Sequence, residues 1–381
     1  MENGVISPSR SKNRNSPLTF VEKGNIITHE HEFIRNHHYS RKSEDMASRK
    51  DVAVLAGVSE VTVSRVFSRN GYVSQVTAEL VKNAARQLDY QPNPIAVSLK
   101  NNATKQILMI LPEQDFENSY FINLYKGAIR YAENAGYMLA VSTDMMFSKI
   151  SKKMFDGIIL ANSSFAPDEL KENLRVPATV LNFGEQNHYP WLESIVVDTG
   201  LAMELMIGYL NGLGHRRIAF AMPRHTLMSG TSSQRYVRYV DLLGGVFKND
   251  TEKYVFGLDH AVAEENLVNY FHYGKVAAEQ IHAKRPDITA VVCFNDEVAL
   301  GLIGRLQSLG IHVPGDLSVA GIDDILQSAY SSPTLTTVRL PAIEQGEESV
   351  KRLINRIAGN DPLANAAFNL EIVPRESTRG A

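Results

Sequence analysis

One short segment near residue 60 concentrates side chains that hydrogen-bond well to nucleic acid. Hydroxyl and guanidinium groups there surround Val63 and Val66, which have the spacing of a helix packing face. Such polar groups donate to phosphate oxygens and, inside a groove, to base edges. Because Val63 and Val66 already supply the packing face, the polar side chains are not needed for packing and can contact a ligand. The set consists of Ser59, Thr62, Ser64 and Arg65.

The residues around this set predict two helices joined by a tight turn. Residues 49–56 carry small and apolar residues at helical spacing, Gly57 breaks the pattern, and Ser59 is a suitable N-cap for the next helix. Two such helices form a helix-turn-helix, whose second helix fits the major groove of B-DNA. A third helix is expected to start at residue 74 and to bury Leu80, Val81, Ala84, Ala85 and Leu88.

The distribution of charge favours DNA binding over a purely structural helix bundle. The chain of 381 residues has a net charge of -3, but residues 46–103 hold seven Lys and Arg against four acids, a net charge of +3. The first 45 residues sum to +1, so the remainder carries -7. A basic module on an acidic body directs polyanion binding to one end of the chain.

At these residues the chain resembles the LacI/GalR family of bacterial transcription repressors. The resemblance implies a helix-turn-helix headpiece over residues 46–103 and a two-lobed, periplasmic-binding-protein-like core over residues 104–381, with three chain crossings between the lobes. Residues 1–45 are expected to form a disordered extension, because Ser, Asn, His and charged residues dominate them. The matching motifs are Asp51-Val52-Ala53, Ala56-Gly57-Val58-Ser59, Thr62-Val63-Ser64-Arg65-Val66 and Leu88-Asp89-Tyr90-Gln91-Pro92-Asn93.

The resemblance assigns base reading to the pair that follows the cap serine, here Glu60-Val61. An ionised Glu60 only accepts hydrogen bonds, so the amino group of cytosine is its natural partner, whereas Val61 can pack on a thymine methyl. The helix dipole also favours an acid in the first turn, so a purely structural role for Glu60 stays open. Arg65 can reach either a guanine or a phosphate. The hydroxyls of Ser59, Thr62 and Ser64 are expected to hold phosphates.

The segment after the headpiece resembles the family's hinge helix, which folds on the operator. Asn93, Ala96 and Leu99 are expected to contact DNA there, with Leu99 as the wedge that unstacks a base step and kinks the duplex. Val97 stands where an arginine is common in the family, so the positive charge in the minor groove is lower here. A plain linker between domains is the alternative.

Apolar runs separated by helical stretches predict two doubly wound parallel sheets. The run 107–111 is typical of a buried parallel strand, and further strands are expected at 137–141, 157–160 and 178–181. A second set is expected at 218–220, 254–256, 290–294 and 317–321, after a helix near 201–213. Two open α/β sheets in series place a ligand at the carboxyl ends of their strands. The expected fold class is thus an α/β core with a small all-α headpiece.

The resemblance places a small-molecule effector between the lobes. An arginine, an asparagine and an aspartate match ligand-binding positions of the family and can hydrogen-bond the hydroxyls of a sugar or nucleoside; the last two can instead cap helices. Two aromatic residues are expected either to stack on a ligand ring or to pack in the core or a lid. Arg238 replaces a glycine usual in the family, which adds bulk and charge nearby. The candidates are Arg235, Asn295 and Asp323, with the aromatic Phe116 and Tyr120.

Other functional classes find little support in the sequence. Cys293, the single cysteine, lies in an apolar strand where an inert buried thiol is expected, and His215 is expected to be structural. The N-terminal histidines have no cysteine partners and no defined spacing, so neither a metal nor a cofactor is expected. No apolar run reaches the ~20 residues of a membrane helix, and the low cysteine content suits a reducing cytoplasm.

Together these features predict a cytoplasmic, nucleoid-associated, homodimeric repressor of carbohydrate genes. It is expected to bind double-stranded operator DNA and a small effector such as a sugar or sugar derivative, and to be neither an enzyme nor a membrane-bound protein. The alternative is a sugar- or nucleoside-binding solute receptor built on the same core. The basic helix-turn-helix segment counts against this alternative.

Replacing Leu99 with alanine should reduce DNA bending while leaving weak, nonspecific binding nearly unchanged. Leu99 carries no charge, so the phosphate contacts of the major-groove helix are retained. Gel shifts on circularly permuted operator fragments would measure the bend. For comparison, Arg65→Ala should cost ~1–3 kcal/mol at specific sites if Arg65 reads a guanine. An operator bent equally by Leu99→Ala and the wild type would show that the segment is only a tether.

Overall fold

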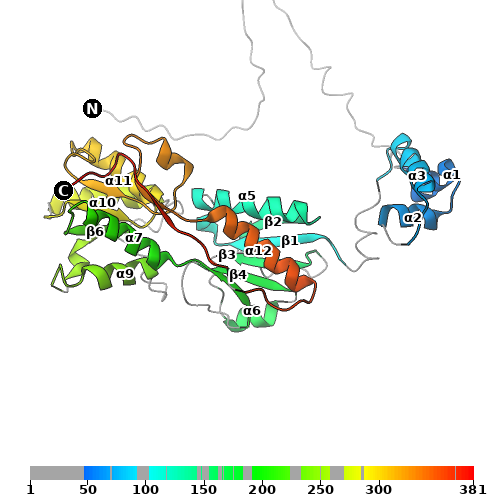
Figure 1. Ribbon diagram of the computed structural model, residues 1–381, viewed down its shortest axis with the longest axis horizontal. Helices are drawn as coiled ribbons and strands as arrows, with labels where there is room; N and C mark the ends of the chain where they lie inside the picture. Colours follow the sequence, from blue (N-terminus) through cyan, green and yellow to red (C-terminus); the bar gives the residue numbers. More distant parts are fainter. Residues whose placement is uncertain are drawn as a thin grey trace, which may run out of the picture. The chain divides into compact units, whose positions relative to one another are not determined.

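The computed structural model of the chain contains two compact units, which divide between Pro92 and Asn93. Figure 1 shows their helices and strands. The expected extension at residues 1–45 and the hinge residues Asn93, Ala96 and Leu99 lie outside the described residues. The structure describes residues 47–68, 71–91, 103–116, 118–143, 147, 154–161, 165, 167–174, 176–182, 191–223, 233–248, 250–257, 270–284, 287–364 and 366–381.

The first unit is the expected three-helix headpiece, with α1 (Arg49–Ala56), α2 (Glu60–Ser68) and α3 (Gln75–Gln87). A serine caps each helix: Ser48 forms a capping box in front of α1, and Ser74 accepts the amide of Thr77 in α3 at 3.2 Å. Gly57, at φ +64°, takes the left-handed conformation that ends α1. The predicted helix-turn-helix is therefore confirmed.

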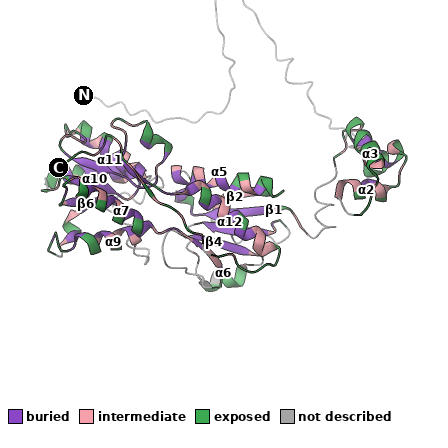
Figure 2. Cartoon of the chain, in the orientation of Figure 1, coloured by how far each residue is buried: buried purple, intermediate pink, exposed green. Residues whose placement is uncertain are grey.

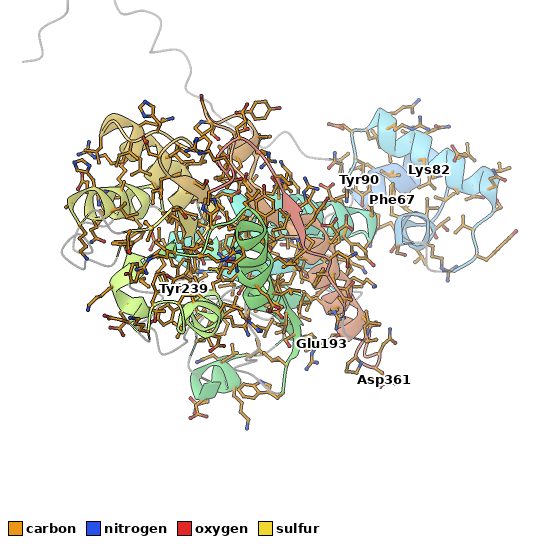
Figure 3. All side chains as sticks on the ribbon, turned by 60° about the vertical axis from the view of Figure 1, so that its left-hand side comes forward. Phe67, Lys82, Tyr90, Glu193, Tyr239 and Asp361 are labelled. Carbon is orange, nitrogen blue, oxygen red and sulfur yellow. The ribbon has the colours of Figure 1, made fainter. Side chains whose placement is uncertain are left out.

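The headpiece core is small and consists mostly of valine and alanine. Val52, Val63 and Val81 are completely buried, and the edge of Phe67 meets the ring of Tyr90 at a centroid distance of 5.8 Å (Figure 3). The prediction that Leu80 is buried is wrong, because 51% of it is exposed. The buried stripe of α3 follows Val81, Ala84 and Ala85, and a residue one step earlier lies about 100° away from this stripe.

The first lobe of the second unit is a five-stranded parallel sheet in the order β2-β1-β3-β4-β5. All of β3 is buried, as expected for a parallel sheet covered on both faces (Figure 2). Strand β5 is absent from the sequence prediction because this short edge strand mixes polar with apolar residues. The elements are β1 (Gln106–Leu111), α5 (Ser119–Asn134), β2 (Met138–Thr143), β3 (Gly157–Ala161), α6 (Pro167–Asn173), β4 (Ala178–Asn182), β5 (Glu193–Val196) and α12 (Ala342–Ile357), with a 3-10 turn η1 (Glu113–Asp115).

The second lobe is a four-stranded parallel sheet in the order β7-β6-β8-β9. His215 has the expected structural role, since its ring nitrogens lie 2.8 Å from the Thr289 hydroxyl and 2.9 Å from the Arg379 carbonyl. The elements are α7 (Thr199–Gly212), β6 (Ile218–Ala221), α9 (Gln234–Leu243), β7 (Val255–Phe256), α10 (Tyr270–Lys284), β8 (Ala290–Cys293), α11 (Asp296–Ser308) and β9 (Ser318–Ala320), with 3-10 turns η3 (Thr251–Tyr254) and η5 (Leu326–Ala329).

Three chain segments connect the lobes, as the family resemblance implies. The first joins β5 to α7, and the second is β10 (Thr337–Arg339), which leads into α12. The third contains β11 (Glu371–Val373), which pairs antiparallel with β10. At one end of this third segment Arg352 of α12 donates to the carbonyl of Leu363 at 3.3 Å, and at the other Ser377 donates to the carbonyl of Val319 at 2.6 Å. Both ends of the segment are therefore anchored, one in each lobe.

Glycines let pairs of helices pack with their backbones in contact. A Cβ atom at Gly127 of α5 would lie 2.0 Å from a carbonyl oxygen of α12, and one at Gly346 of α12 would lie 2.0 Å from a carbonyl oxygen of α5. In the second lobe Gly274 and Gly301 bring α10 and α11 equally close. Each lobe is thus held by a helix pair that has no room for a side chain at the crossing.

Gly127→Ala should therefore lower the free energy of unfolding by ~1–3 kcal/mol or more, because the added methyl forces α5 and α12 apart. Gly208→Ala in α7 is the matched control, since its Cβ would meet nothing within 4 Å. That substitution should be neutral or stabilise by about 0.5–1 kcal/mol, the helix preference of alanine over glycine. Urea unfolding of both variants measures the difference, and equal stabilities would contradict the packing described above.

Candidate DNA interface and effector site

Helix α2 exposes the side chains that the sequence assigns to DNA. Val63 is completely buried, whereas 59% of Val61 is exposed and Arg65 is also exposed. An apolar side chain that the core does not use is available to pack on a thymine methyl. Ser59 accepts the amide of Thr62 at 3.2 Å, and the two hydroxyls lie 2.9 Å apart. Since one hydroxyl proton serves this contact, the other can be donated to a phosphate.

Glu60 has a partner inside the headpiece. Arg49 of α1 donates from Nε to Glu60 Oε2 at 3.1 Å, and both side chains are about half exposed. Ion pairs this exposed contribute little to stability, ~0–1 kcal/mol. The pair gives the Glu60 carboxylate a partner on α1, which supports the structural role, but it is weak enough to be exchanged for a contact with DNA.

A buried ion pair lies near the carboxyl ends of the second lobe's strands. Arg235, in the first turn of α9, approaches Asp323, after β9, at 3.5 Å between Nη2 and Oδ1, and both side chains are less than a tenth exposed. The Arg235 guanidinium also donates to the carbonyl of Phe294 and lies 4.7 Å from the centroid of its ring. Burial raises the pKa of Asp323 well above its usual range, and Arg235 opposes this rise. The pair offers a ligand one donor group and one acceptor group.

The candidate Asn295 and the neighbouring Arg238 both have local partners. Asn295 is buried and caps α11, because its Oδ1 accepts the amide of Val298 at 2.9 Å. Arg238, which replaces the family's glycine, forms an ion pair with Glu204 of α7 at 3.3 Å. The positive charge of Arg238 therefore has a partner on α7. This pairing makes the charge less of an obstacle to a nearby effector.

The two aromatic candidates differ in burial. Tyr120 is buried in α5, its hydroxyl donates to Oε1 of Gln345, and both burial and the charge of Asp323 raise its pKa well above the usual range. The pKa of Tyr120, in the first lobe, thus depends in part on the charge of Asp323 in the second lobe. Phe116 is 44% exposed and packs against Tyr125 with ring centroids 6.5 Å apart.

Three residues of this region escaped the sequence analysis. Tyr270, at the start of α10, stacks on Phe294 with ring centroids 6.1 Å apart and an interplanar angle of 8°. Burial raises the pKa of Tyr270 well above the usual range, with further contributions from nearby charges that include Asp323. Phe294 was visible as the residue before Asn295 at the end of a predicted strand. Tyr270 has no motif that would have indicated its position.

The third missed residue, Glu297, reaches from α11 to the first lobe. Its Oε1 accepts the amide of Ser119 at 3.0 Å and the hydroxyl at 2.8 Å, at the N-terminus of α5. The helix dipole favours a carboxylate at this position. Gln327 of η5 donates to the same hydroxyl at 3.1 Å. We call the Ser119–Glu297 contact the inter-lobe latch, because opening of the lobes at this point must break it.

Comparison with known proteins identifies the family. The description "Bacterial regulatory proteins, lacI family" matches residues 49–93, and "Periplasmic binding protein-like domain" matches residues 207–378. The chain is 33% identical to the HTH-type transcriptional repressor PurR of Vibrio cholerae serotype O1 (strain M66-2), over 88% of this chain and 98% of that protein. This chain belongs to the lacI family. It is also 29% identical to the HTH-type transcriptional repressor CytR of Escherichia coli (strain K12), over 89% of this chain and 98% of that one.

The fold of this lacI-family protein agrees with solved structures. The lac repressor dimer bound to operator and the anti-inducer ONPF superposes with a TM-score of 0.72, at 24% identity, over 87% of this chain and 99% of that chain. The lacI-family protein is a DNA-binding transcription regulator and not an enzyme. Cys293 is completely buried, and burial raises its pKa well above the usual range, so the thiol is inert as expected.

Membrane and metal features were also examined in the described part of the chain. None of its helices is long and apolar enough to cross a membrane. None of its groups of three or more His, Cys, Asp and Glu side chains could hold a metal ion. The four N-terminal histidines considered in the sequence lie outside these residues.

Glu297→Ala should speed hydrogen exchange at the Ser119 amide, because this donor loses its carboxylate partner in the inter-lobe latch. Hydrogen bonds to charged groups contribute ~1.5–3 kcal/mol each, so the effect on local opening is large. Glu297→Gln keeps an acceptor oxygen and should give an intermediate rate. Exchange measured by NMR or mass spectrometry on the full chain tests this, and an unchanged rate in Glu297→Ala would show that the latch does not hold the lobes.

Proposed function

We propose that this lacI-family protein is a homodimeric repressor whose operator binding is controlled by a purine base or nucleoside held between the lobes. The buried Arg235–Asp323 pair, bordered by aromatic rings, carries this choice of effector. Tyr270 stacks on Phe294, and Arg235 lies over the same Phe294 ring. A planar ligand that needs one strong donor, one carboxylate and an aromatic contact suits these surroundings.

Oxopurines such as guanine and hypoxanthine present the matching groups. Their ring carbonyl accepts hydrogen bonds from a guanidinium, and their ring N–H donates to a carboxylate. When such a ligand enters between Arg235 and Asp323, its carbonyl pairs with the guanidinium and its N–H pairs with the carboxylate. Neither buried charge is then left without a partner. The residues proposed to contact the effector are Arg235, Asp323, Asn295, Tyr120 and Phe116, with Tyr270 and Phe294 added.

The relatives PurR and CytR are transcriptional repressors, which supports the assignment of repression. The carbohydrate expected from the sequence is the alternative, because a buried carboxylate also hydrogen-bonds vicinal hydroxyls. A nucleoside combines the two chemistries. The solute-receptor alternative does not account for the headpiece.

On the DNA side, the proposal assigns residues 46–103 to the operator and residues 104–381 to effector binding and dimerisation. Exposed Val61 and Arg65 support a role for α2 in the major groove. The hinge residues are proposed to act in the minor groove. The full set is Ser59, Glu60, Val61, Thr62, Ser64, Arg65, Asn93, Ala96 and Leu99.

A homodimer is supported by exposed apolar side chains on neighbouring elements. Leu326 and Tyr330, in and after η5, are 69% and 81% exposed, and Ile122 of α5 is 47% exposed. The hydrogen bond from Gln327 to Ser119 joins η5 to the start of α5, the two elements next to these side chains. Apolar patches of this kind mark protein contacts. A two-fold dimer would place two α2 helices on a pseudo-palindromic operator.

Isothermal titration of the full chain should show binding of guanine or hypoxanthine and weaker or no binding of glucose. Asp323→Asn should remove purine binding, since an amide cannot supply the second acceptor oxygen or the charge that Arg235 requires. The matched control is Asp241→Asn, which changes an exposed carboxylate of the same helix α9 that carries Arg235. Gel shifts on operator DNA, with and without each ligand, then measure whether the ligand changes operator affinity. Tight binding of a sugar without binding of any purine would favour the carbohydrate alternative.

A further inference from the structure

Two consecutive aspartates after β9, the first of them in the Arg235–Asp323 pair, have backbone conformations that L-residues rarely adopt. The φ angle is +135° at Asp323 and +58° at Asp324. Such conformations are unfavourable and persist only where surrounding contacts impose them, which occurs most often at functional sites. Asp323 faces Arg235, so the question is which contacts hold this pair of residues.

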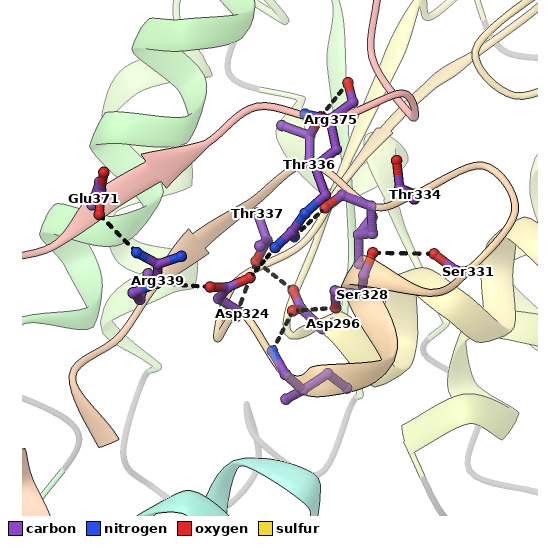
Figure 4. Close-up of polar contacts among 12 residues, drawn as sticks. Asp296, Asp324, Ser328, Ser331, Thr334, Thr336, Thr337, Arg339, Glu371 and Arg375 are labelled. Carbon is purple, nitrogen blue, oxygen red and sulfur yellow. Dashed lines mark hydrogen bonds and ion pairs between the residues drawn. The ribbon is translucent and has the colours of Figure 1, made fainter. Parts of the chain in front are cut away.

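Both oxygens of the Asp324 carboxylate are held by arginines. Arg339 donates from Nε to Oδ2 at 2.7 Å, and Arg375 donates from Nη2 to Oδ1 at 2.6 Å (Figure 4). The Asp324 side chain is only 10% exposed and that of Arg375 16% exposed. The charge-assisted bond from Arg375, which has so little access to water, is strong, whereas the bond from the half-exposed Arg339 is weaker. We call these three residues the Asp324–Arg339–Arg375 clamp.

The two arginines come from two of the segments that connect the lobes. Arg339 ends β10 and Arg375 follows β11, and these strands pair with each other. Arg339 also donates to Glu371 of β11 at 2.9 Å, and Arg375 donates to the carbonyl of Leu335 at 2.7 Å. The carboxylate of Asp324 is therefore attached to both of these connecting segments.

The backbone of Asp323 is attached to β10 as well. Its amide donates to the carbonyl of Val338 at 2.8 Å, and its carbonyl accepts the amide of Leu340 at 3.4 Å. The amide of Asp324 donates to the hydroxyl of Thr337 at 3.3 Å. A displacement of β10 thus moves the Asp323 backbone, and a pull on the Asp323 side chain acts on β10.

We propose that Asp324 is a positioning residue: the clamp holds Asp323 in its conformation facing Arg235 and couples effector binding to the crossing strands between the lobes. The inference rests on the proposed function, in which Asp323 contacts the effector. Effector binding can shift a lobe equilibrium only through contacts that differ between the two arrangements. The clamp is placed to provide such contacts because Arg339 and Arg375 belong to two of the segments that connect the lobes.

Asp324→Asn is the variant that tests the clamp. Asparagine has nearly the same shape and tolerates a positive φ, but it lacks the charge that the two arginines require. Glu371→Gln is the matched control, since it removes an exposed partner of Arg339 and leaves both contacts of Asp324 in place. Arg339→Gln, at a half-exposed side chain, removes one arm of the clamp and serves if Asp324→Asn fails to fold.

The first readout needs no ligand. In the full chain, Asp324→Asn and Arg339→Gln should speed hydrogen exchange at the amides of Asp323 and Leu340, whereas Glu371→Gln should not. Wild-type exchange rates at both amides in Asp324→Asn would overturn the proposal.

The second readout uses guanine as the probe and measures its Kd with and without operator DNA. The ratio of the two values is the coupling factor, which is about 5–150 in typical allosteric proteins. Asp324→Asn should bring this ratio to about one while operator affinity without guanine is unchanged, a separation that a general loss of stability would not produce. A wild-type ratio in Asp324→Asn would overturn the proposal.

Asp323→Asn separates failure of the clamp from failure of the proposed function. Loss of guanine binding in Asp323→Asn together with wild-type coupling in Asp324→Asn refutes the clamp alone. If the wild type does not bind guanine, or if Asp323→Asn binds it as the wild type does, the proposed effector site is wrong. The hydrogen-exchange rates then decide whether Asp324 positions its neighbour.

Discussion

The completely buried carboxylate of Asp296 holds together the start of α11, the η5 turn and the connecting strand β10 (Figure 4). Its Oδ2 accepts the amide of Ile325 at 3.0 Å and the hydroxyl of Ser328 at 2.6 Å, and its Oδ1 accepts the hydroxyl of Thr337 at 2.5 Å. Burial raises the pKa of Asp296 to about 6, and these donors oppose a larger rise. Because a buried carboxylate without donors is very unfavourable, η5 and β10 must converge on the start of α11.

At the start of α11, three consecutive residues each have a different role. Asn295 caps α11, Asp296 organises the interior, and Glu297 crosses to the N-terminus of α5. The backbone of Asp323 is hydrogen-bonded to β10, which also reaches Asp296 through Thr337, so the Arg235–Asp323 pair depends on the same support. The lobes themselves are stiffened by helix pairs without space for a Cβ atom.

Local patterns were sufficient for the helix-turn-helix and for most strands. Serine caps, Gly57 and the runs of buried aliphatic residues act through neighbours in sequence, so they can be recognised without a fold. Strand β5 and the exposure of Leu80 depended on longer-range contacts. Whether a short mixed segment joins a sheet edge, and which side of α3 faces its partners, is decided by the elements that pack against them.

For the site, the sequence by itself determined the residue types: a motif resemblance located Arg235 and Asp323 at strand and helix ends. Only the tertiary structure decided their partners. Glu60 pairs with Arg49, and Glu297 reaches across 178 residues to the start of α5. The same holds for the two arginines on Asp324. Hydrogen bonds and ion pairs form only between groups a few ångströms apart. The positions of two residues in the sequence do not show whether folding brings their side chains that close.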